Sequence, residues 1–336
     1  MTTNSTARRY QRVVAILIGL AAAVGGGTSI AQTRVIEPVP VKWKLSDDFE
    51  KSRDARTNIS GAACFTFKTC VAVNDEKKYA QFFAINGTEI RPGKVIRLID
   101  DQASGNPDAE GAAYDNGFFY ITGSHGRGRH HPEKNDDLSY LVFRFAIDTT
   151  TGAPPFHISE DKVVGVESSS RLREVIKDEL PKFYDKPLDD NGANVEGIAV
   201  KDGRMYLGFR GPSVDGDAFL ISVDAEAVFT AHKALDARLI PLKLGTDTGV
   251  RDLAAVSNGL LILSGPVNDQ TVTPAVRLLN PATEKLGQPT ELAVADKTAK
   301  AETLLILKDE AGQPWRALVM FDGPENGAPT EYLIPR

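Results

Sequence analysis

Apolar and polar residues alternate in short runs along most of the chain, which is the pattern of β-strands with one buried face. One example has apolar runs around 195–200, 205–208 and 218–224, with a Lys-Asp-Gly turn at 201–203. Turns of Asp-Asn-Gly and Asn-Gly recur elsewhere, and these residues tolerate the positive φ of tight hairpins. Strand follows strand with almost no helical spacing between them. We therefore predict an all-β fold and exclude a doubly wound α/β fold.

One sequence pattern occurs five times. Each copy begins with an acidic or polar residue, runs through small and apolar residues into a turn, and continues into a second strand and a loop. The repeated positions, about 50 residues apart except for one interval of 86, are Ser60, Glu110, Glu196, Asp252 and Glu302. This spacing is typical of a β-propeller blade, which takes about 40–50 residues. We predict a five-bladed β-propeller, or a six-bladed one if an irregular stretch holds a further blade.

The fifth copy is short, because only 36 residues remain from Ala301 to the end. The segment Val35–Leu45 precedes the first copy and has no partner there. An N-terminal strand that completes the last blade removes an open sheet edge. We predict that this segment closes the ring in that way, and that residues 32–336 form a single propeller domain.

The long interval between the second and third copies contains two insertions, at 124–137 and at 168–193. The second insertion has apolar residues at helical spacing, which are Leu172, Val175, Ile176 and Leu180. Both insertions fall on one face of the ring, and elaboration on one face of a repeat protein usually marks its binding face. We predict an amphipathic helix that lies over the channel mouth at this face.

The starts of the first strands and the ends of the second strands should meet at the mouth of the central channel. The candidate ligand-binding residues there are Asp108, Glu110, His125, Arg127, Glu196, Arg210, Arg251, Asp252 and Glu302. Converging carboxylates need a positive partner, which Ca²⁺ or Mg²⁺ can supply, with Glu110 and Asp252 as the candidate metal ligands. We predict that Glu196 forms an ion pair with Arg210, and that Glu110 faces the His- and Arg-rich loop 125–129.

A structural role is the alternative for the repeated acids. A contact that holds blades together is needed in every blade, whereas a catalytic carboxylate is needed only once. In that case each acid accepts backbone N–H groups of a neighbouring blade. The loop that contains His125, His130 and His131 also has alternatives: a solvated surface loop, an anion site or a metal site. The chain contains no G-x-S-x-G elbow, no Gly-rich phosphate loop and no H-E-x-x-H motif.

Residues 1–31 have the features of a secretory signal peptide. A basic start is followed by the apolar run Val13–Val24 and by small residues before Gln32. The run is too short to span a bilayer as a helix, and an uncleaved anchor is the alternative. The pair Arg8-Arg9 is also compatible with twin-arginine export. We predict a periplasmic or secreted protein that has no membrane span after the signal is removed.

The two cysteines, Cys64 and Cys70, are predicted to form a disulfide in this compartment, with a reduced buried pair as the alternative. Removal of residues 1–31 takes away three arginines and no acid, so the net charge falls from -6 to -9. The remaining chain has no basic tract. We therefore expect neither nucleic acid nor an anionic membrane as a partner, and we expect a monomer.

The repeated motifs also resemble a known family. VEGIA at 195–199 with GFRGP at 208–212, and VRDLAA at 250–255 with LSGP at 263–266, resemble the bacterial domain-of-unknown-function family 3616 (DUF3616). The resemblance covers nearly the whole chain after the signal and implies a secreted, propeller-like protein. The Glu-Gly-hydrophobic-Ala strand start is more distantly similar to secreted propellers described as esterase-like phytases. Neither resemblance supplies catalytic residues.

Three functions are consistent with these observations. The first is binding of a small, anionic ligand or a divalent cation at the channel mouth. The second is a metal-assisted hydrolase that acts on esters or phosphoesters. The third is a protein-interaction scaffold, which the lack of a long exposed apolar stretch disfavours. The sequence leaves open whether the protein is an enzyme.

Overall fold

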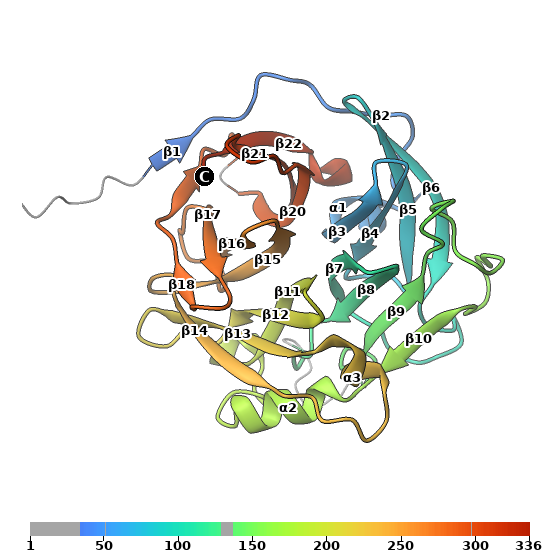
Figure 1. Ribbon diagram of the computed structural model, residues 1–336, viewed down its shortest axis with the longest axis horizontal. Helices are drawn as coiled ribbons and strands as arrows, with labels where there is room; N and C mark the ends of the chain where they lie inside the picture. Colours follow the sequence, from blue (N-terminus) through green and yellow to red (C-terminus); the bar gives the residue numbers. More distant parts are fainter. Residues whose placement is uncertain (1–33, 51, 129–136, 297) are drawn as a thin grey trace, which may run out of the picture. The chain divides into compact units, whose positions relative to one another are not determined.

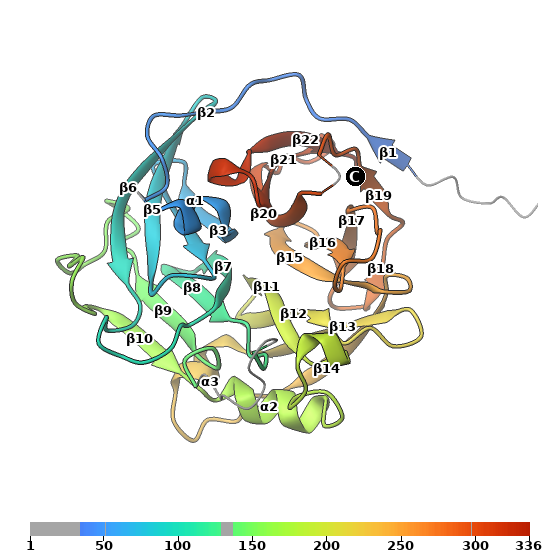
Figure 2. The ribbon, with the colours of Figure 1, turned by 180° about the vertical axis from the view of Figure 1, so that it is seen from behind.

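The computed structural model describes residues 34–50, 52–128, 137–296 and 298–336. Within these residues the strands form five sheets arranged in a ring (Figures 1 and 2). The predicted five-bladed β-propeller is therefore confirmed. The proposed signal peptide, His130 and His131 lie outside the described residues. No helix in the described part of the chain is long and apolar enough to cross a membrane.

Each blade is an antiparallel sheet whose first strand is innermost. The first blade contains β3 (Ile59–Thr66), β4 (Thr69–Asn74), β5 (Tyr79–Asn86) and β6 (Glu89–Arg97). The second contains β7 (Ala109–Asp115), β8 (Phe118–Gly123), β9 (Val142–Ala146) and β10 (Val166–Ser169). The third contains β11 (Asn194–Lys201), β12 (Arg204–Gly211), β13 (Asp217–Asp224) and β14 (Arg238–Lys243). The fourth contains β15 (Thr248–Val256), β16 (Gly259–Pro266), β17 (Ala275–Asn280), β18 (Lys285–Leu286) and β19 (Thr290–Leu292). The fifth contains β20 (Lys300–Lys308), β21 (Trp315–Asp322) and β22 (Thr330–Ile334).

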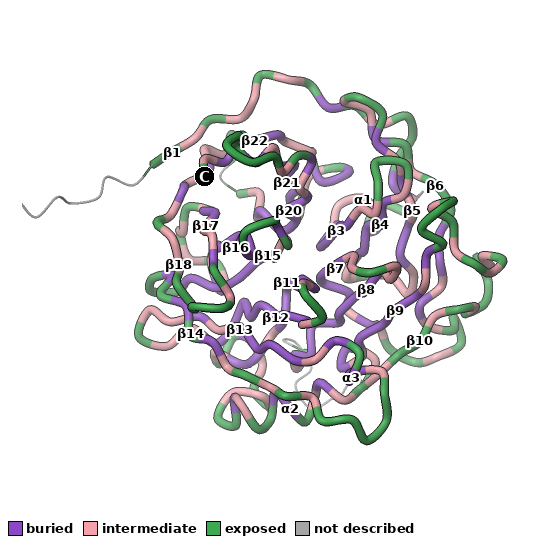
Figure 3. Tube along the Cα trace, viewed as in Figure 1, coloured by how far each residue is buried: buried purple, intermediate pink, exposed green. Residues whose placement is uncertain are grey.

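The innermost strands β3, β7, β11, β15 and β20 contact one another in a closed cycle. The described residues form five apolar clusters, each of which joins two neighbouring blades. Between the first and second blades, for example, Val71 and Ala80 pack with Phe119 and Phe143. Figure 3 shows that buried residues follow the inner strands, while exposed ones lie mostly at turns and at the rim. The core is thus distributed between blades, and the rigid ring holds the loops at the channel mouth in place.

The N-terminal segment closes the ring, but it does so differently from the prediction. Its strand β1 (Arg34–Ile36) pairs in parallel with β19 of the fourth blade, and β2 (Lys44–Leu45) pairs in parallel with β6 of the first. Between them, Val39 N donates to Glu331 O of β22 at 2.8 Å. The segment therefore runs along the outside of the fifth blade (Figure 1) and does not complete it as a fourth strand. Pro38 and Pro40 provide the reason, because neither has an N–H to contribute to a ladder.

The predicted helix is present as α2 (Leu172–Glu179), but it does not cover the mouth. Leu172 and Ile176 are fully buried in the cluster between the second and third blades, and Figure 1 shows the helix at the rim. Its apolar face is used for packing against the blades, so the helix is held at the outside of the ring. The remaining short helical elements are α1 (Arg53–Thr57), α3 (Ala225–Phe229), η1 (Leu188–Asp190) and η2 (Glu325–Gly327).

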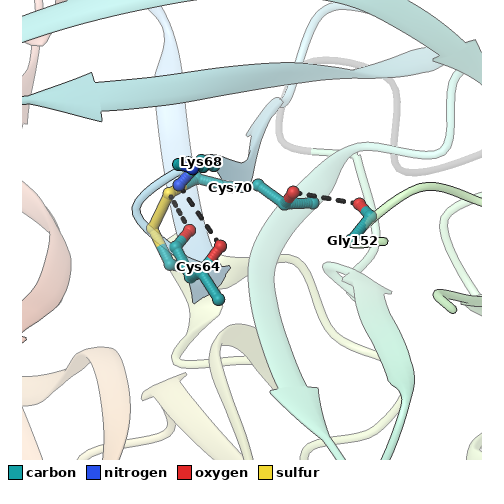
Figure 4. The surroundings of a disulfide bond; sticks show 6 residues. Cys64, Lys68, Cys70 and Gly152 are labelled. Carbon is teal, nitrogen blue, oxygen red and sulfur yellow. Dashed lines mark hydrogen bonds between the residues drawn. A yellow bond between two sulfur atoms is a disulfide. The ribbon is translucent and has the colours of Figure 1, made fainter. Parts of the chain in front are cut away.

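The predicted disulfide between Cys64 and Cys70 is present, and no described cysteine is free (Figure 4). The two cysteines are directly opposite each other on β3 and β4. Next to Cys70, the Thr69 hydroxyl donates to Gly152 O at 2.9 Å, which ties this hairpin to a loop of the second blade. The disulfide thus staples the innermost hairpin of the first blade.

Candidate functional site

A β-bulge occurs near the start of every innermost strand. In each blade the pairing with the second strand skips one residue, and a bulge turns the side chain of the skipped residue out of the regular alternation. The skipped residues, which we call the bulge ring, are Ser60, Glu110, Glu196, Arg251 and Glu302. All five are buried, with at most 8% of their surface exposed. The repeated Glu-Gly motif is therefore the sequence of a bulge.

The glycine of this motif allows neighbouring inner strands to approach closely. A Cβ atom on Gly61 would lie 2.7 Å from Gly111 Cα, and one on Gly197 would lie 2.9 Å from the carbonyl carbon of Asp252. Real Cβ atoms do not tolerate such contacts with backbone. The small residue is thus required by the packing of one blade against the next.

Asp252 occupies this second position of the motif and not the bulge position, which belongs to Arg251. Its Oδ1 accepts a hydrogen bond from Leu253 N and its Oδ2 accepts one from Leu304 N of the fifth blade, both at 2.7 Å. Both oxygens of Asp252 are thus engaged with backbone, and its assignment as a ligand-binding or metal-binding residue stays a prediction. The carboxylate ties two blades together, which is the structural role considered for the repeated acids.

The two arginines of the mouth are already engaged with carboxylates. Arg210 Nη1 lies 2.9 Å from Glu196 Oε1, so the predicted ion pair is present, and Arg210 Nε donates to Val267 O at 2.6 Å. Arg251 Nη2 forms ion pairs with Glu302 Oε1 and, at 3.5 Å, with Glu196 Oε2. Burial lowers the pKa of Arg251 to about 10, which leaves it charged at neutral pH.

Glu110 has a different environment from Glu196. We expected it to face the loop 125–129, but the charges around it are mainly those of Glu196, Asp108 and Asp75, with Arg210 as the opposing charge. Burial, followed by the repulsion of these acids, raises the pKa of Glu110 well above its ordinary value. The Glu110 side chain is buried, with 8% of its surface exposed.

Asp75 is a second carboxyl group in this environment. It follows β4, and burial together with the nearby Asp108, Glu76, Asp322 and Glu196 raises the pKa of Asp75 to about 8. Its Oδ1 is buried and has no hydrogen-bond partner among the described residues. Asp75 follows the second strand of the first unit in the sequence and so falls on the mouth face, but it was not among the candidate ligand-binding residues.

His125 and Arg127 do not join the bulge ring. His125 is fully buried in the left-handed region (φ 51°), its backbone carbonyl accepts a hydrogen bond from Arg173 of α2, and both ring nitrogens lack a partner among the described residues. Burial lowers the pKa of His125 to about 3, so the ring is neutral. Arg127 forms an ion pair with Asp185 of the insertion at 3.1 Å. Both residues therefore belong to the contact between the second blade and the insertion.

The mouth is acidic as a whole. The ionisable side chains that act on one another there are Asp75, Asp108, Glu110, Glu196, Glu302, Asp322, Arg210 and Arg251. Even with Asp75 and Glu110 protonated, four carboxylates accompany two arginines, which does not favour the anionic ligand expected from the sequence. Over the described residues, no three His, Cys, Asp or Glu side chains are placed to share a metal ion. Deeper in the channel, the strand residues that follow the ring line a cavity of about 150 Å³ with small side chains such as Ala62, Ala112 and Ala199.

Comparisons with known proteins match the chain to one sequence family. A family model described as protein of unknown function (DUF3616) matches residues 159–331. No curated protein sequence matches the chain. No esterase or phytase is among the structures named below, and that likeness remains one of a short motif.

Solved structures with similar folds are distant in sequence. A GH43 β-1,3-galactosidase with galactodeoxynojirimycin is 11% identical, with a TM-score of 0.49 and coverage of 88% of this chain and 93% of that one. An exo-β-1,3-galactanase from Phanerochaete chrysosporium is 10% identical, with a TM-score of 0.47 and coverage of 85% and 62%. The calcium-binding protein regucalcin from Agrobacterium tumefaciens is 12% identical, with a TM-score of 0.39 and coverage of 90% and 95%.

Proposed function

Because the chain belongs to the DUF3616 family of proteins of unknown function, we propose a function from the chemistry of its channel mouth alone. We propose that the mouth binds a small cation, and that Glu110 and Asp75 are the carboxyl groups that receive it. The observation that carries this proposal is the raised pKa of both groups, which are buried among other acids.

Among the described residues neither carboxyl group forms an ion pair of the kind that Glu196 and Glu302 form with arginines, although the charge of Arg210 acts on Glu110. Glu196 and Glu302 are paired with arginines, whereas Asp75 Oδ1 is buried without a donor in the described part of the chain. A buried carboxyl group that has no donor keeps its proton to a higher pH than usual. A cation that replaces this proton gains both the attraction of the acids and the vacant acceptor positions. The acids of the mouth outnumber its arginines, and their attraction for a cation also supports a positively charged ligand.

A protonated amine suits this arrangement better than a chelated metal ion. Calcium and magnesium ions take six or more oxygen ligands around one point, and the described carboxylates do not converge in threes. An ammonium group needs only two or three acceptors, and it donates hydrogen bonds in several directions. Glu110 and Asp75 therefore support an amine, with a hydrated divalent ion as the other source of positive charge.

The test is isothermal titration calorimetry at pH 7 with 1,4-diaminobutane, CaCl₂ and MgCl₂ as separate probes. We expect the diamine to bind and to release protons, so that the apparent enthalpy changes with the ionisation enthalpy of the buffer. Glu110→Gln and Asp75→Asn should each weaken binding by about tenfold or more, the size expected when one charge-assisted hydrogen bond is lost. Glu310→Gln, which removes an exposed carboxylate outside the mouth, is the matched control. Absence of binding by all three probes, or equal binding by all variants, would overturn the proposal.

A hydrolase is the second candidate, and the raised pKa of Asp75 favours it. A carboxyl group that is protonated at neutral pH can donate a proton to a leaving group. Turnover of any member of an ester and phosphoester panel, lost in Asp75→Asn and retained in Glu310→Gln, would identify this activity. We also infer a periplasmic or secreted location, which the disulfide supports because such bonds persist in oxidising compartments.

A further inference from the structure

A second cavity lies on the same face as the channel mouth, between the fourth and fifth blades. Its volume is about 570 Å³, which lies within the range of about 300–1,000 Å³ typical of small-molecule sites. It is bounded by the connection from β16 to β17 and by the connection from β19 to β20, with Val35 of β1 at its edge. We propose that this cavity, which we call the interblade pocket, binds a small, neutral, largely apolar molecule that carries one N–H or O–H donor.

The walls of the interblade pocket determine the apolar character of the ligand. The apolar side chains that line it are Val35, Pro266, Val272, Pro274, Leu292 and Val294. Leu292 is fully buried, and Val35 is 55% exposed, so the pocket has an enclosed inner wall and an open edge. Burial of apolar surface stabilises a complex because it releases water from that surface. We therefore expect the ligand to contain an apolar ring system, which would displace water from these walls.

One polar group of the lining lacks a partner. Asn268 lies in the connection from β16 to β17, and its side-chain Oδ1 is buried without a hydrogen-bond partner in the described part of the chain. Leaving such an acceptor unpaired is unfavourable, because it has lost its hydrogen bond to water. When the side-chain amide turns toward the cavity, a ligand N–H or O–H satisfies this acceptor, which adds orientation to the apolar contacts.

The charged residues of the lining are two acids and one lysine. Lys300 Nζ lies 3.2 Å from Asp269 Oδ1, and Asp296 also lines the cavity. An anionic ligand would meet these two acids, and a cationic ligand would compete with Lys300 for Asp269. A neutral ligand avoids both costs, which separates the interblade pocket from the acidic mouth, where a cation is favoured.

The pocket and the mouth share one wall, although their ligands differ. Gly265 lines the pocket, and a Cβ atom on it would lie 3.0 Å from Cγ of Arg251, a member of the bulge ring. Arg210 donates to Val267 O in the same connection. The two sites are therefore neighbours with separate chemistry, and each can be tested while the other is altered.

The probe is N-phenyl-1-naphthylamine, which is neutral, apolar, carries one N–H donor and fluoresces more strongly in apolar surroundings. We expect a saturable rise of fluorescence on titration with the protein, with a Kd below about 100 μM. Val294→Trp fills the cavity and should weaken binding by about tenfold or more, and Val272→Trp serves as the second variant if the first does not fold. Asn268→Ala should weaken binding roughly two- to tenfold, the effect of one lost neutral hydrogen bond.

Two controls locate the bound probe. Val163→Trp introduces the same side chain at an exposed valine outside the pocket and should leave the Kd unchanged. Glu110→Gln should also leave it unchanged, so the outcome is independent of cation binding at the mouth. Absence of saturable fluorescence would overturn the proposal. Equal affinity of folded Val294→Trp, Val272→Trp and the unmodified protein would overturn it as well, because the probe would then bind elsewhere.

Discussion

The pKa of Asp75 makes a prediction about stability as well as binding. In the folded protein Asp75 keeps its proton up to about pH 8, whereas in the unfolded chain it loses the proton near its ordinary pKa of 3.8. Between these pH values the folded state binds more protons than the unfolded state. The free energy of unfolding must therefore fall as the pH rises, by up to about 1.4 kcal/mol per pH unit for this one group.

The substitution Asp75→Asn removes this pH dependence while it keeps the shape of the side chain. The full difference between 3.8 and about 8 corresponds to a ceiling of roughly 5 kcal/mol at pH 8. The amide still needs partners of its own, and the neighbouring Glu110 responds to the lost charge. We therefore expect Asp75→Asn to stabilise the protein by about 1–3 kcal/mol at pH 8 and by close to zero at pH 4.

Urea denaturation at pH 4, 6, 7 and 8 measures this effect, with unfolding followed by tryptophan fluorescence. The control is Asp161→Asn, which removes an exposed aspartate and should change stability by less than about 0.5 kcal/mol at every pH. The reasoning is refuted if Asp75→Asn destabilises the protein by the same amount at all four pH values. It is also refuted if the stability of the unmodified protein rises from pH 6 to pH 8 while that of the variant does not.

Two further predictions concern the inner strands. Glu196→Gln breaks a buried ion pair with Arg210 and should lower the free energy of unfolding by about 3–5 kcal/mol, whereas Glu110→Gln should cost little; equal losses in thermal melts of both variants would contradict this distinction. Gly197→Ala places a Cβ atom against the backbone of Asp252 and should cost about 1–3 kcal/mol in chemical denaturation, and an unchanged midpoint would show that the inner strands can move apart.

The repeat made the fold predictable, because each blade is a local structural unit that corresponds to one copy of the repeated sequence pattern. Alternating runs, Gly-containing turns and a spacing near 50 residues identified five blades, and the structure contains them. The attachment of the N-terminal segment was predicted less well. The N-terminal segment pairs with β19 and β6, and this choice depends on which outer strand edges stay unpaired in the folded ring. Pro38 and Pro40 have no N–H to donate, so the residues around them cannot form a regular ladder with β22.

The site was predictable in its location and less so in its details. The acids do meet at the mouth, but the alignment of VRDLAA with VEGIA was wrong by one residue, because a bulge leaves no mark in the sequence beyond its small following residue. In consequence Asp252 was assigned to the mouth, and Arg251 was not recognised as the ring member of the fourth blade. His125 was misplaced because its burial results from the insertion and from α2, whose position depends on tertiary packing.

The N-terminal strap constrains the order in which the molecule can be assembled. Residues 34–45 are synthesised before the rest of the described chain, yet their partners are β19, β22 and β6. The strap therefore cannot take its final place until β19 and β22 of the last two blades have been made. The beginning of this domain is the last part to be attached.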